Sequence, residues 1–484
     1  MAVVFSEEQS NVINLRDRNI LVSAAAGSGK TTVLVERIIQ MITDEKNPVD
    51  IDHLLVVTFT NAAAASMREK ISNAIAKKLE SEYSDHLQKQ ATLIHHAQIT
   101  TIDSFCLFIL QNNFNDIGLE PGFRVADQGE IRLLKEDVMD NLLEKRLLED
   151  EHGKFEHLLN RFVKGSKFAG FKDVLFSLYD RALSYPFVKD WLVERKEDYK
   201  IGEDFDSASW VQEIFAYAAR ELAYCKELAL QNVEDCKAAG GPSTYLPMME
   251  ADLALVDELL ACDSYTKLHE KIQVLDFIRL STKKDESADP DFKELVKKHR
   301  DEFKKTLQNL QKDFFAFSVE DMREAAAENA VIVEELCDTL LAFHEDFLAV
   351  KKDKKLIDFS DMEHFALEIL LQKEGDSYVP TKTALEYREY FHEIMIDEYQ
   401  DSNLVQEWLL QCISKEDNGV YNRFMVGDVK QSIYQFRLAR PQIFMEKFDT
   451  YEKEVHDAVK LQRIDLAKNY RSRREVVECV NYLF

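Results

Sequence analysis

A run of small residues ending in lysine and threonine indicates a phosphate-binding loop near the amino terminus. The segment AAAGSGKT departs from the pattern GxxxxGK[ST] only at Ala24, which stands where glycine is usual. In such loops backbone N–H groups surround the phosphates, the lysine reaches the β and γ phosphates, and the threonine hydroxyl holds Mg²⁺. A glycine-rich turn without ligand is the alternative, but a strand-like run precedes the segment and a helical pattern follows it. The residues expected to bind nucleotide here are Ala26, Gly27, Ser28, Gly29, Lys30, Thr31 and Thr32.

Two neighbouring carboxylates follow a short apolar run much later in the chain. Asp397 and Glu398 come directly after the strand-like residues 394–396. Open α/β sheets bind ligands at the carboxyl ends of their strands. We therefore expect Asp397 to hold Mg²⁺ and Glu398 to polarise an attacking water, as phosphoryl transfer to water requires. An apolar-Asp-Glu run alone is weak evidence, and it becomes strong only if it meets Lys30, which we expect on an adjacent strand.

The segment GDVKQSIYQFR (residues 427–437) carries a glutamine and an aromatic pair with an arginine. Gln431 is a candidate sensor of the γ-phosphate. Tyr434, Phe436 and Arg437 suit stacking on bases and contact with phosphate. Taken alone, the two aromatic residues are more often part of a core than a platform for bases.

Hydroxyl and amide side chains follow two other apolar runs. Phe59, Thr60 and Asn61 follow one of them, and Thr101 and Asp103 follow the other. If these runs are strands of one parallel sheet, the side chains share its carboxyl edge and suit backbone contacts to a nucleic-acid strand. Helix capping by Thr60, Asn61 or Asp103 is an equally good interpretation.

A basic segment, NYRSRR (residues 469–474), lies near the end of the sequence. Its functional interpretation places Arg471 on the γ-phosphate, reaching across from a second domain. A solvated start of a basic helix is the alternative.

The elements that must position these residues alternate between strand-like and helix-like patterns at both ends of the chain. Such alternation predicts an α/β fold with a parallel sheet covered on both faces. From about residue 127 to 371 the apolar spacing is almost entirely helical. The sequence therefore predicts an α/β domain interrupted by a large all-helical insertion.

Composition is that of a globular protein, with 46% hydrophobic and 31% charged residues. A net charge of −27 disfavours phosphate contact, yet between Arg423 and Arg474 the chain has 12 basic against 7 acidic residues. Net charge thus neither supports nor excludes DNA binding. The seven cysteines are scattered and include no CxxC pair, which favours a reducing compartment. No apolar run is long enough to span a membrane, so we expect the protein in the cytoplasm.

Six elements in order resemble the superfamily 1 helicases of the UvrD/RecB type. The elements are FSEEQ, AAAGSGKTT, TFTNAAAASM, TTIDSF, IDEYQDSN with GDVKQSIYQFR, and NYRS. More narrowly, the stretches LLVVTFTNAAAASM, PGFRVADQGE, AGGP and IDFSDMEHFAL resemble the helicase–nuclease subunits of AddAB-type bacterial recombination complexes. The resemblance implies a 3′→5′ DNA helicase of double-strand break repair that uses ATP and Mg²⁺, binds single strands and duplex ends, and has an AddB-like partner.

The resemblance also implies roles and boundaries. Gln9 stands at the position that recognises adenine and Arg37 at the arginine flanking the base, while Gln431 and Arg471 stand at γ-phosphate sensors. Asp103 departs from the family, in which histidine is common, and Phe436 stands where UvrD-like members have tryptophan. The expected parts are a first RecA-like domain (1–125 and 371–450), a helical accessory arm (126–370) and the start of a second RecA-like domain (451–484).

The chain ends at Phe484, so we expect a fragment that lacks the rest of the second motor domain and the nuclease, and that has little activity alone. Two other functions remain open. One is a UvrD/Rep-type repair helicase without nuclease, which the sequence beyond Phe484 would distinguish. The other is a non-catalytic DNA-binding scaffold, against which the intact set of Lys30, Asp397, Glu398 and Gln431 argues.

Overall fold

The computed structural model describes residues 5–162, 168–283, 288–433 and 438–483. The chain forms two compact units, each built from more than one segment. Unit 1 comprises Met1–Asn141, Phe176–Val188 and Phe343–Phe484, and unit 2 comprises Leu142–Leu175 and Lys189–Ala342.

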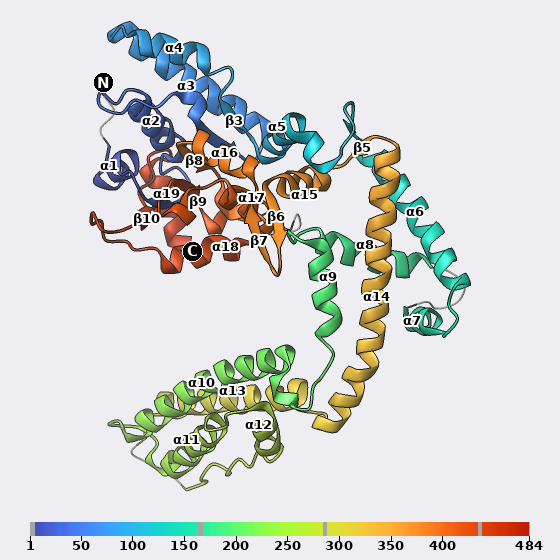
Figure 1. Cartoon of the computed structure of the whole chain (residues 1–484). Coiled ribbons are helices and arrows are strands. Elements are labelled where there is room, and N and C mark those ends of the chain that lie inside the picture. The colour runs from blue at the N-terminus through green and yellow to red at the C-terminus, as the bar shows by residue number, and fades with distance from the viewer. Residues whose placement is uncertain (1–4, 163–167, 284–287, 434–437, 484) are drawn as a thin grey trace. The chain divides into compact units, whose positions relative to one another are not determined.

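Unit 1 is built on a six-stranded sheet in the order β10-β1-β9-β8-β2-β3, and every pairing in it is parallel (Figure 1). Strands from the two ends of the chain thus lie side by side, which confirms the expected α/β fold with a parallel sheet. The strands are β1 (Asn19–Ala24), β2 (Leu54–Thr58), β3 (Gln98–Thr101), β8 (Glu393–Ile396), β9 (Arg423–Gly427) and β10 (Leu461–Leu466).

Alternate side chains of these strands enter two separate hydrophobic cores, one on each face of the sheet. In β2, Leu54 and Val56 join the core that also contains Val33 and Met67, whereas Leu55 and Val57 join the core that also contains Phe105 and Leu367. Each fully buried aliphatic side chain contributes roughly 1.5–3 kcal/mol. Burial on both faces explains why the strands read as continuous apolar runs in the sequence.

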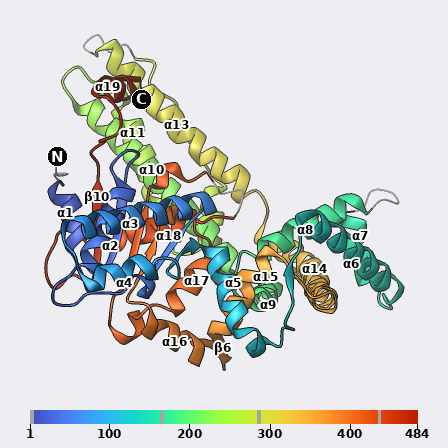
Figure 2. The same ribbon diagram turned by 90° about the horizontal axis from the view of Figure 1, so that it is seen from above.

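The covering helices come from both ends of the chain. Helices α5 and α15, distant in sequence, pack side by side (Figures 1 and 2). The helices wholly in unit 1 are α1 (Glu7–Asn14), α2 (Lys30–Ile42), α3 (Asn61–Ser81), α4 (Asp85–Leu93), α5 (Ile102–Asn113), α15 (Phe359–Leu370), α16 (Lys382–Tyr390), α17 (Leu404–Cys412), α18 (Pro441–Thr450) and α19 (Arg474–Leu483).

Two short pairs of strands complete unit 1. Strands β4 (Arg124–Val125) and β5 (Leu356–Ile357) pair in parallel at the two ends of the long helical region. Strands β6 (Leu371–Glu374) and β7 (Ser377–Pro380) form an antiparallel hairpin directly after α15.

The secondary structure of unit 2 is entirely helical in its described residues. Its main core gathers Phe303 and Leu307 of α13 against α10, α11 and α12, and beside it Arg300 and Asp252 form a buried ion pair with 2.5 Å between Nε and Oδ2. The helices wholly in unit 2 are α7 (Lys154–Phe162), α10 (Ser209–Lys237), α11 (Leu246–Leu260), α12 (Tyr265–Ile272) and α13 (Pro290–Phe314). Four further helices have residues in both units: α6 (Gln128–Leu148), α8 (Ala169–Ala182), α9 (Val188–Glu197) and α14 (Val319–Asp353).

The contacts divide the chain differently from the expected boundaries in two places. Strand β10 pairs residue for residue with β1, so residues 461–466 belong to the first sheet rather than to the start of a second domain. Residues 126–141, 176–188 and 343–370 pack with unit 1 rather than with the helical insertion. Helical periodicity shows where helices lie in a sequence, but not which core their apolar faces enter.

Candidate active site

The phosphate-loop segment connects β1 to α2 and is shaped by two glycines. Gly27 and Gly29 have φ angles of 77° and 90°, in the left-handed region where a side chain is strained. Ser28 between them is 1% exposed. Half-buried Thr31 and exposed Thr32 follow in the first turn of α2. The loop therefore places the amino terminus of α2 at the carboxyl edge of the sheet, where backbone N–H groups attract anions.

Lys30 meets the second motif at this edge, although 368 residues separate them. Its Nζ lies 3.4 Å from Oε2 of Glu398, which follows β8. Strand β9 lies between β1 and β8, so the expectation that the two motifs stand on adjacent strands is wrong. A glutamate and a lysine side chain are together long enough to bridge the intervening strand.

The carboxylate pair combines a left-handed backbone at Glu398 with a raised pKa at Asp397. Glu398 has φ 53° and ψ 43°, a left-handed conformation that costs about 1–2 kcal/mol for a residue with a side chain. Burial and the neighbouring charge of Glu398 raise the pKa of Asp397 to about 6, against the opposing charge of Lys30. Nearby Asp401 also has a raised pKa because of burial. A divalent cation bound beside Asp397 would favour its ionised form.

Gln9 lies beside the phosphate loop, as a residue of a nucleotide site would. It closes the capping box of α1 with Ser6, and its Nε2 donates to the Ser28 carbonyl at 3.1 Å. A small cavity of about 70 Å³ opens here, and Gln9 and Ser28 share its lining with Tyr470.

Arg37 does not lie beside this cavity. Its side chain is 1% exposed, and its Nε and Nη2 donate to Glu393 at 2.7 and 3.1 Å. Its Nη1 donates to the carbonyls of Val12 and Leu15, both at 2.7 Å. The expected place beside the base is therefore corrected, because every guanidinium nitrogen is already bound in the packing of α1, α2 and β8.

The segment 469–472 lies against the phosphate loop. Asn469 Nδ2 donates to the Ala26 carbonyl at 3.0 Å, and the Tyr470 N–H donates to the Gly27 carbonyl at 2.8 Å. A Cβ on residue 27 would lie 2.6 Å from Asn469 Oδ1, so a side chain here would displace Asn469 and also hold a strained φ of 77°. Arg471, the expected phosphate sensor, is exposed in the turn that Asn469 organises.

The other expected phosphate sensor, Gln431, sits in a turn that follows β9. Its Nε2 donates to Asp428 Oδ2 at 2.7 Å. Asp428 also caps this turn by accepting from the Lys430 N–H at 3.1 Å.

The candidate nucleic-acid residues fall into two groups. Half-buried Phe59 and exposed Thr60 and Asn61 follow β2, and Thr101 and Asp103 follow the neighbouring β3. Thr60 caps α3 by accepting from Ala63 N–H at 3.1 Å, and Thr101 caps α5 by accepting from Ser104 N–H at 3.3 Å. The capping interpretation thus holds for Thr60, and the cap of α5 is Thr101 rather than Asp103. Tyr434, Phe436 and Arg437 lie outside the described residues.

Sequence reasoning missed Gln400, which is 1% exposed and donates to Glu398 Oε2 at 2.9 Å. The signal was its place two residues after Glu398, in IDEYQD. Within the described ranges no cluster of three or more His, Cys, Asp or Glu side chains is placed to hold a metal ion.

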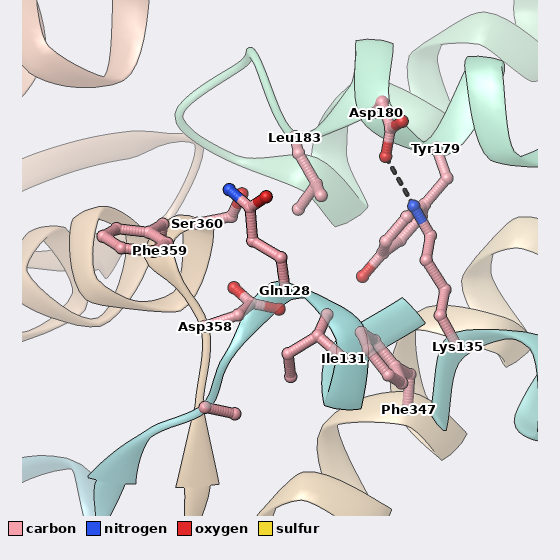
Figure 3. Close-up of a pocket in the computed structure, with 11 residues that line it drawn as sticks. Gln128, Ile131, Lys135, Tyr179, Asp180, Leu183, Phe347, Asp358, Phe359 and Ser360 are labelled. Atoms are coloured by element: carbon pink, nitrogen blue, oxygen red, sulfur yellow. Dashed lines mark hydrogen bonds and ion pairs between the residues drawn. The ribbon is translucent and has the colours of Figure 1, made fainter. Parts of the chain in front are cut away.

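A second cavity, of about 190 Å³, lies in unit 1 away from these motifs (Figure 3). Lys135 reaches along its wall and pairs with Asp180 at 2.6 Å, while the rings of Tyr179 and Phe347 form apolar wall. The residues predicted to bind nucleotide or DNA do not line it.

A parallel sheet that carries a phosphate loop after β1 and a carboxylate pair after β8 defines a RecA-like P-loop nucleoside triphosphatase. The chain belongs to the UvrD/REP helicase family, because residues 5–452 match the UvrD/REP helicase N-terminal domain. None of the described helices has the length and apolar character needed to cross a membrane.

Several curated relatives align with nearly the whole length of this chain. It is 46% identical to an ATP-dependent helicase/nuclease subunit of Lachnoclostridium phytofermentans, over 98% of this chain and 35% of that protein. Proteins of the same name from Acetivibrio thermocellus and Clostridium botulinum are 41% and 40% identical, each over 99% of this chain and 39% of their own length. The chain therefore spans 35–39% of the length of these relatives.

Proposed function

We propose that the chain is the ATP-hydrolysing motor portion of a 3′→5′ DNA helicase–nuclease subunit. The observation that carries the proposal is the approach of Lys30 to Glu398 beside the left-handed glycines of the phosphate loop. A lysine, a carboxylate pair and a helix amino terminus at one sheet edge are the parts that phosphoryl transfer to water needs.

Each residue at this edge has a role that its position supports. The loop from Ala26 to Gly29 and the start of α2 bind the phosphates, and Lys30 neutralises their charge. Thr31 and Asp397 hold Mg²⁺, which when bound neutralises charge developing on the β and γ phosphates. Glu398 orients the attacking water and accepts its proton.

Other predicted residues act around this centre. Gln9 reads the base from the small cavity beside Ser28. Gln431 and Arg471 respond to the γ-phosphate. Nucleic-acid contact is proposed for the edge formed by Phe59, Thr60, Asn61, Thr101 and Asp103, and for Tyr434, Phe436 and Arg437.

Further functions are proposed for the complete protein by analogy with relatives whose name describes a helicase/nuclease. These are unwinding and resection of DNA ends in double-strand break repair by homologous recombination, with nuclease activity outside this chain and an AddB-like partner. The seven cysteines, all unpaired in the structure, are compatible with a reducing cytoplasm.

Polarity-resolved unwinding by the complete protein tests the proposal. ATP hydrolysis that rises with single-stranded DNA, and unwinding of a duplex with a 3′ overhang but not one with a 5′ overhang, is the expected result. Hydrolysis that does not respond to DNA would overturn the motor function. Unwinding without any DNA cleavage would instead favour a repair helicase that has no nuclease.

A further inference from the structure

Gln400 joins two parts of the candidate active site. Its Nε2 donates to Glu398 Oε2 at 2.9 Å and to Asp401 Oδ2 at 3.2 Å. Its Oε1 accepts from the backbone N–H of Asp428 at 2.9 Å. A single buried amide therefore holds the carboxylate that follows β8 and the turn that follows β9.

The surroundings leave this amide one orientation. Because the Asp428 N–H must be met by an acceptor, the oxygen of Gln400 faces β9 and its NH₂ group faces the carboxylates. Gly427, just before Asp428, leaves room for this arrangement, since a Cβ there would lie 2.4 Å from Gln400 Oε1. The Phe444 ring, 3.0 Å from the same Cβ position, also leaves no room for a side chain at residue 427.

The contacts continue on both sides of the amide. Glu398 Oε2 is also 3.4 Å from Lys30 Nζ, and the Asp428 carboxylate accepts from Gln431 Nε2 at 2.7 Å. A continuous chain of polar contacts therefore runs from Lys30 through Glu398, Gln400 and Asp428 to Gln431.

We propose that Gln400 is a positioning residue that aims Glu398 at the attacking water and couples it to the turn carrying Gln431. The inference rests on the proposed ATP hydrolysis. When Lys30 turns toward phosphate, Glu398 loses a cationic partner and keeps the amide of Gln400. A neutral donor fixes the direction of the carboxylate without quenching its basicity as a lysine would.

The turn beyond Gln400 gives this coupling a direction. Gln431 precedes the sequence positions proposed for DNA contact by only a few residues. A shift of this turn must move the Asp428 N–H, and through Gln400 it must move Glu398. DNA stimulation of hydrolysis therefore depends on Gln400.

The test compares Gln400→Leu with Gln90→Leu in the complete protein. Gln90 is a matched control: it is also fully buried, it accepts from the Ile51 N–H at 2.8 Å, and it donates to Asp50 at 2.7 Å. We expect Gln400→Leu to lower the DNA-stimulated kcat by about 10²-fold, as for a misplaced general base, with little change in the Kd of a fluorescent ATP analogue. Gln90→Leu changes thermal stability without this split between kcat and Kd.

A second variant reaches the same contact from the other side. Gly427→Ala leaves the amide chemically intact, but the added Cβ would lie 2.4 Å from its oxygen and 3.0 Å from the Phe444 ring. We expect kcat to fall while ATP affinity holds, and thermal denaturation measures the separate cost of the Phe444 contact. Because both changes disturb the contact between the Gln400 amide and the Asp428 N–H, their losses in kcat do not add in the double variant.

The outcomes separate the two levels of the proposal. A wild-type protein without DNA-stimulated hydrolysis overturns the proposed function itself. If the wild type is active, and Gln400→Leu matches Gln90→Leu in kcat and Kd while both proteins are folded, the positioning role of Gln400 is wrong. Fully additive losses in the double variant also refute the coupling.

Discussion

Arg37 and Glu393 form a buried bidentate ion pair that ties α2 to the first residue of β8. Their side chains are only 2% and 7% exposed, and the Arg37 guanidinium also lies 4.7 Å from the Phe424 ring centroid. The pair sits at the amino ends of the strands, whereas Lys30 and Glu398 meet at the carboxyl ends. Helix α2 is thus fixed to both ends of β8, by Lys30 in its first turn and by Arg37 near its middle.

Replacing Arg37 by leucine is expected to destabilise unit 1 rather than to weaken nucleotide binding. A buried carboxylate left without its partner typically costs about 3–5 kcal/mol. Chemical denaturation of the single variant and of the Arg37→Leu/Glu393→Leu double variant measures the effect, and the double variant should recover part of the loss. Unchanged stability combined with weaker ATP binding would instead support the original expectation that Arg37 lies beside the adenine base.

Replacing Lys30 by alanine is expected to abolish ATP turnover in the complete protein, with a loss of at least about 10²-fold from missing charge stabilisation. Steady-state hydrolysis with saturating single-stranded DNA measures it. Lys89→Ala is the matched control, because Lys89 is an exposed lysine that pairs with Asp50 far from the phosphate loop. Turnover at the wild-type rate in Lys30→Ala would refute the assignment of the site.

Gly27→Ala is expected to weaken ATP binding more than it lowers stability. The alanine must adopt a φ near 77° and its Cβ meets Asn469, so the loop has to change shape. Gly153→Ala is the control, since Gly153 has φ 66° and open space around its Cβ position. Both variants lose about 1–2 kcal/mol of stability from backbone strain, and only Gly27→Ala changes the Kd in a nucleotide titration.

Glu407 is expected to contribute to the acid sensitivity of unit 1. Burial raises its pKa, but the charges of Arg423 and Lys447 outweigh burial and bring the pKa to about 2, below its ordinary value of 4.5. A lowered pKa means that the stabilisation is complete above pH 4.5 and is lost as the pH falls toward 2. The loss is on the order of 3 kcal/mol.

Denaturation midpoints between about pH 5 and 2 measure this contribution. Glu407→Gln should flatten the dependence, because the amide does not titrate. Glu478→Gln removes an exposed partner of Arg474 and should leave the profile as it is. Equal slopes for wild type and Glu407→Gln would exclude Glu407 as a source of the acid sensitivity.

The sequence predicted those features that depend on short stretches of the chain. The parallel sheet followed from buried apolar runs, and the approach of Lys30 to Glu398 followed from the rule that ligands bind at the carboxyl ends of strands. The order of the strands in the sheet could not be predicted, because an apolar run does not indicate which strand pairs with it. For this reason the sequence places β10 in a second domain and does not predict β9 between β1 and β8.

Side-chain partners were the least predictable. Arg37 falls in the helix that follows the phosphate loop, yet its guanidinium is bound to a glutamate 356 residues away. Gln400 is part of the segment IDEYQDSN, but its role depends on a backbone N–H that follows another strand. Both depend on distances across the sheet, which spacing within one segment does not encode.

The contact of Asn469 with the phosphate loop gives the loop two competing neighbours. Asn469 Nδ2 and the Tyr470 N–H bind the carbonyls of Ala26 and Gly27, which belong to the loop that we propose to bind the triphosphate. A displacement of the segment after β10 would therefore act on the phosphate loop through these two hydrogen bonds. We therefore expect nucleotide binding and the conformation of residues 469–472 to change together.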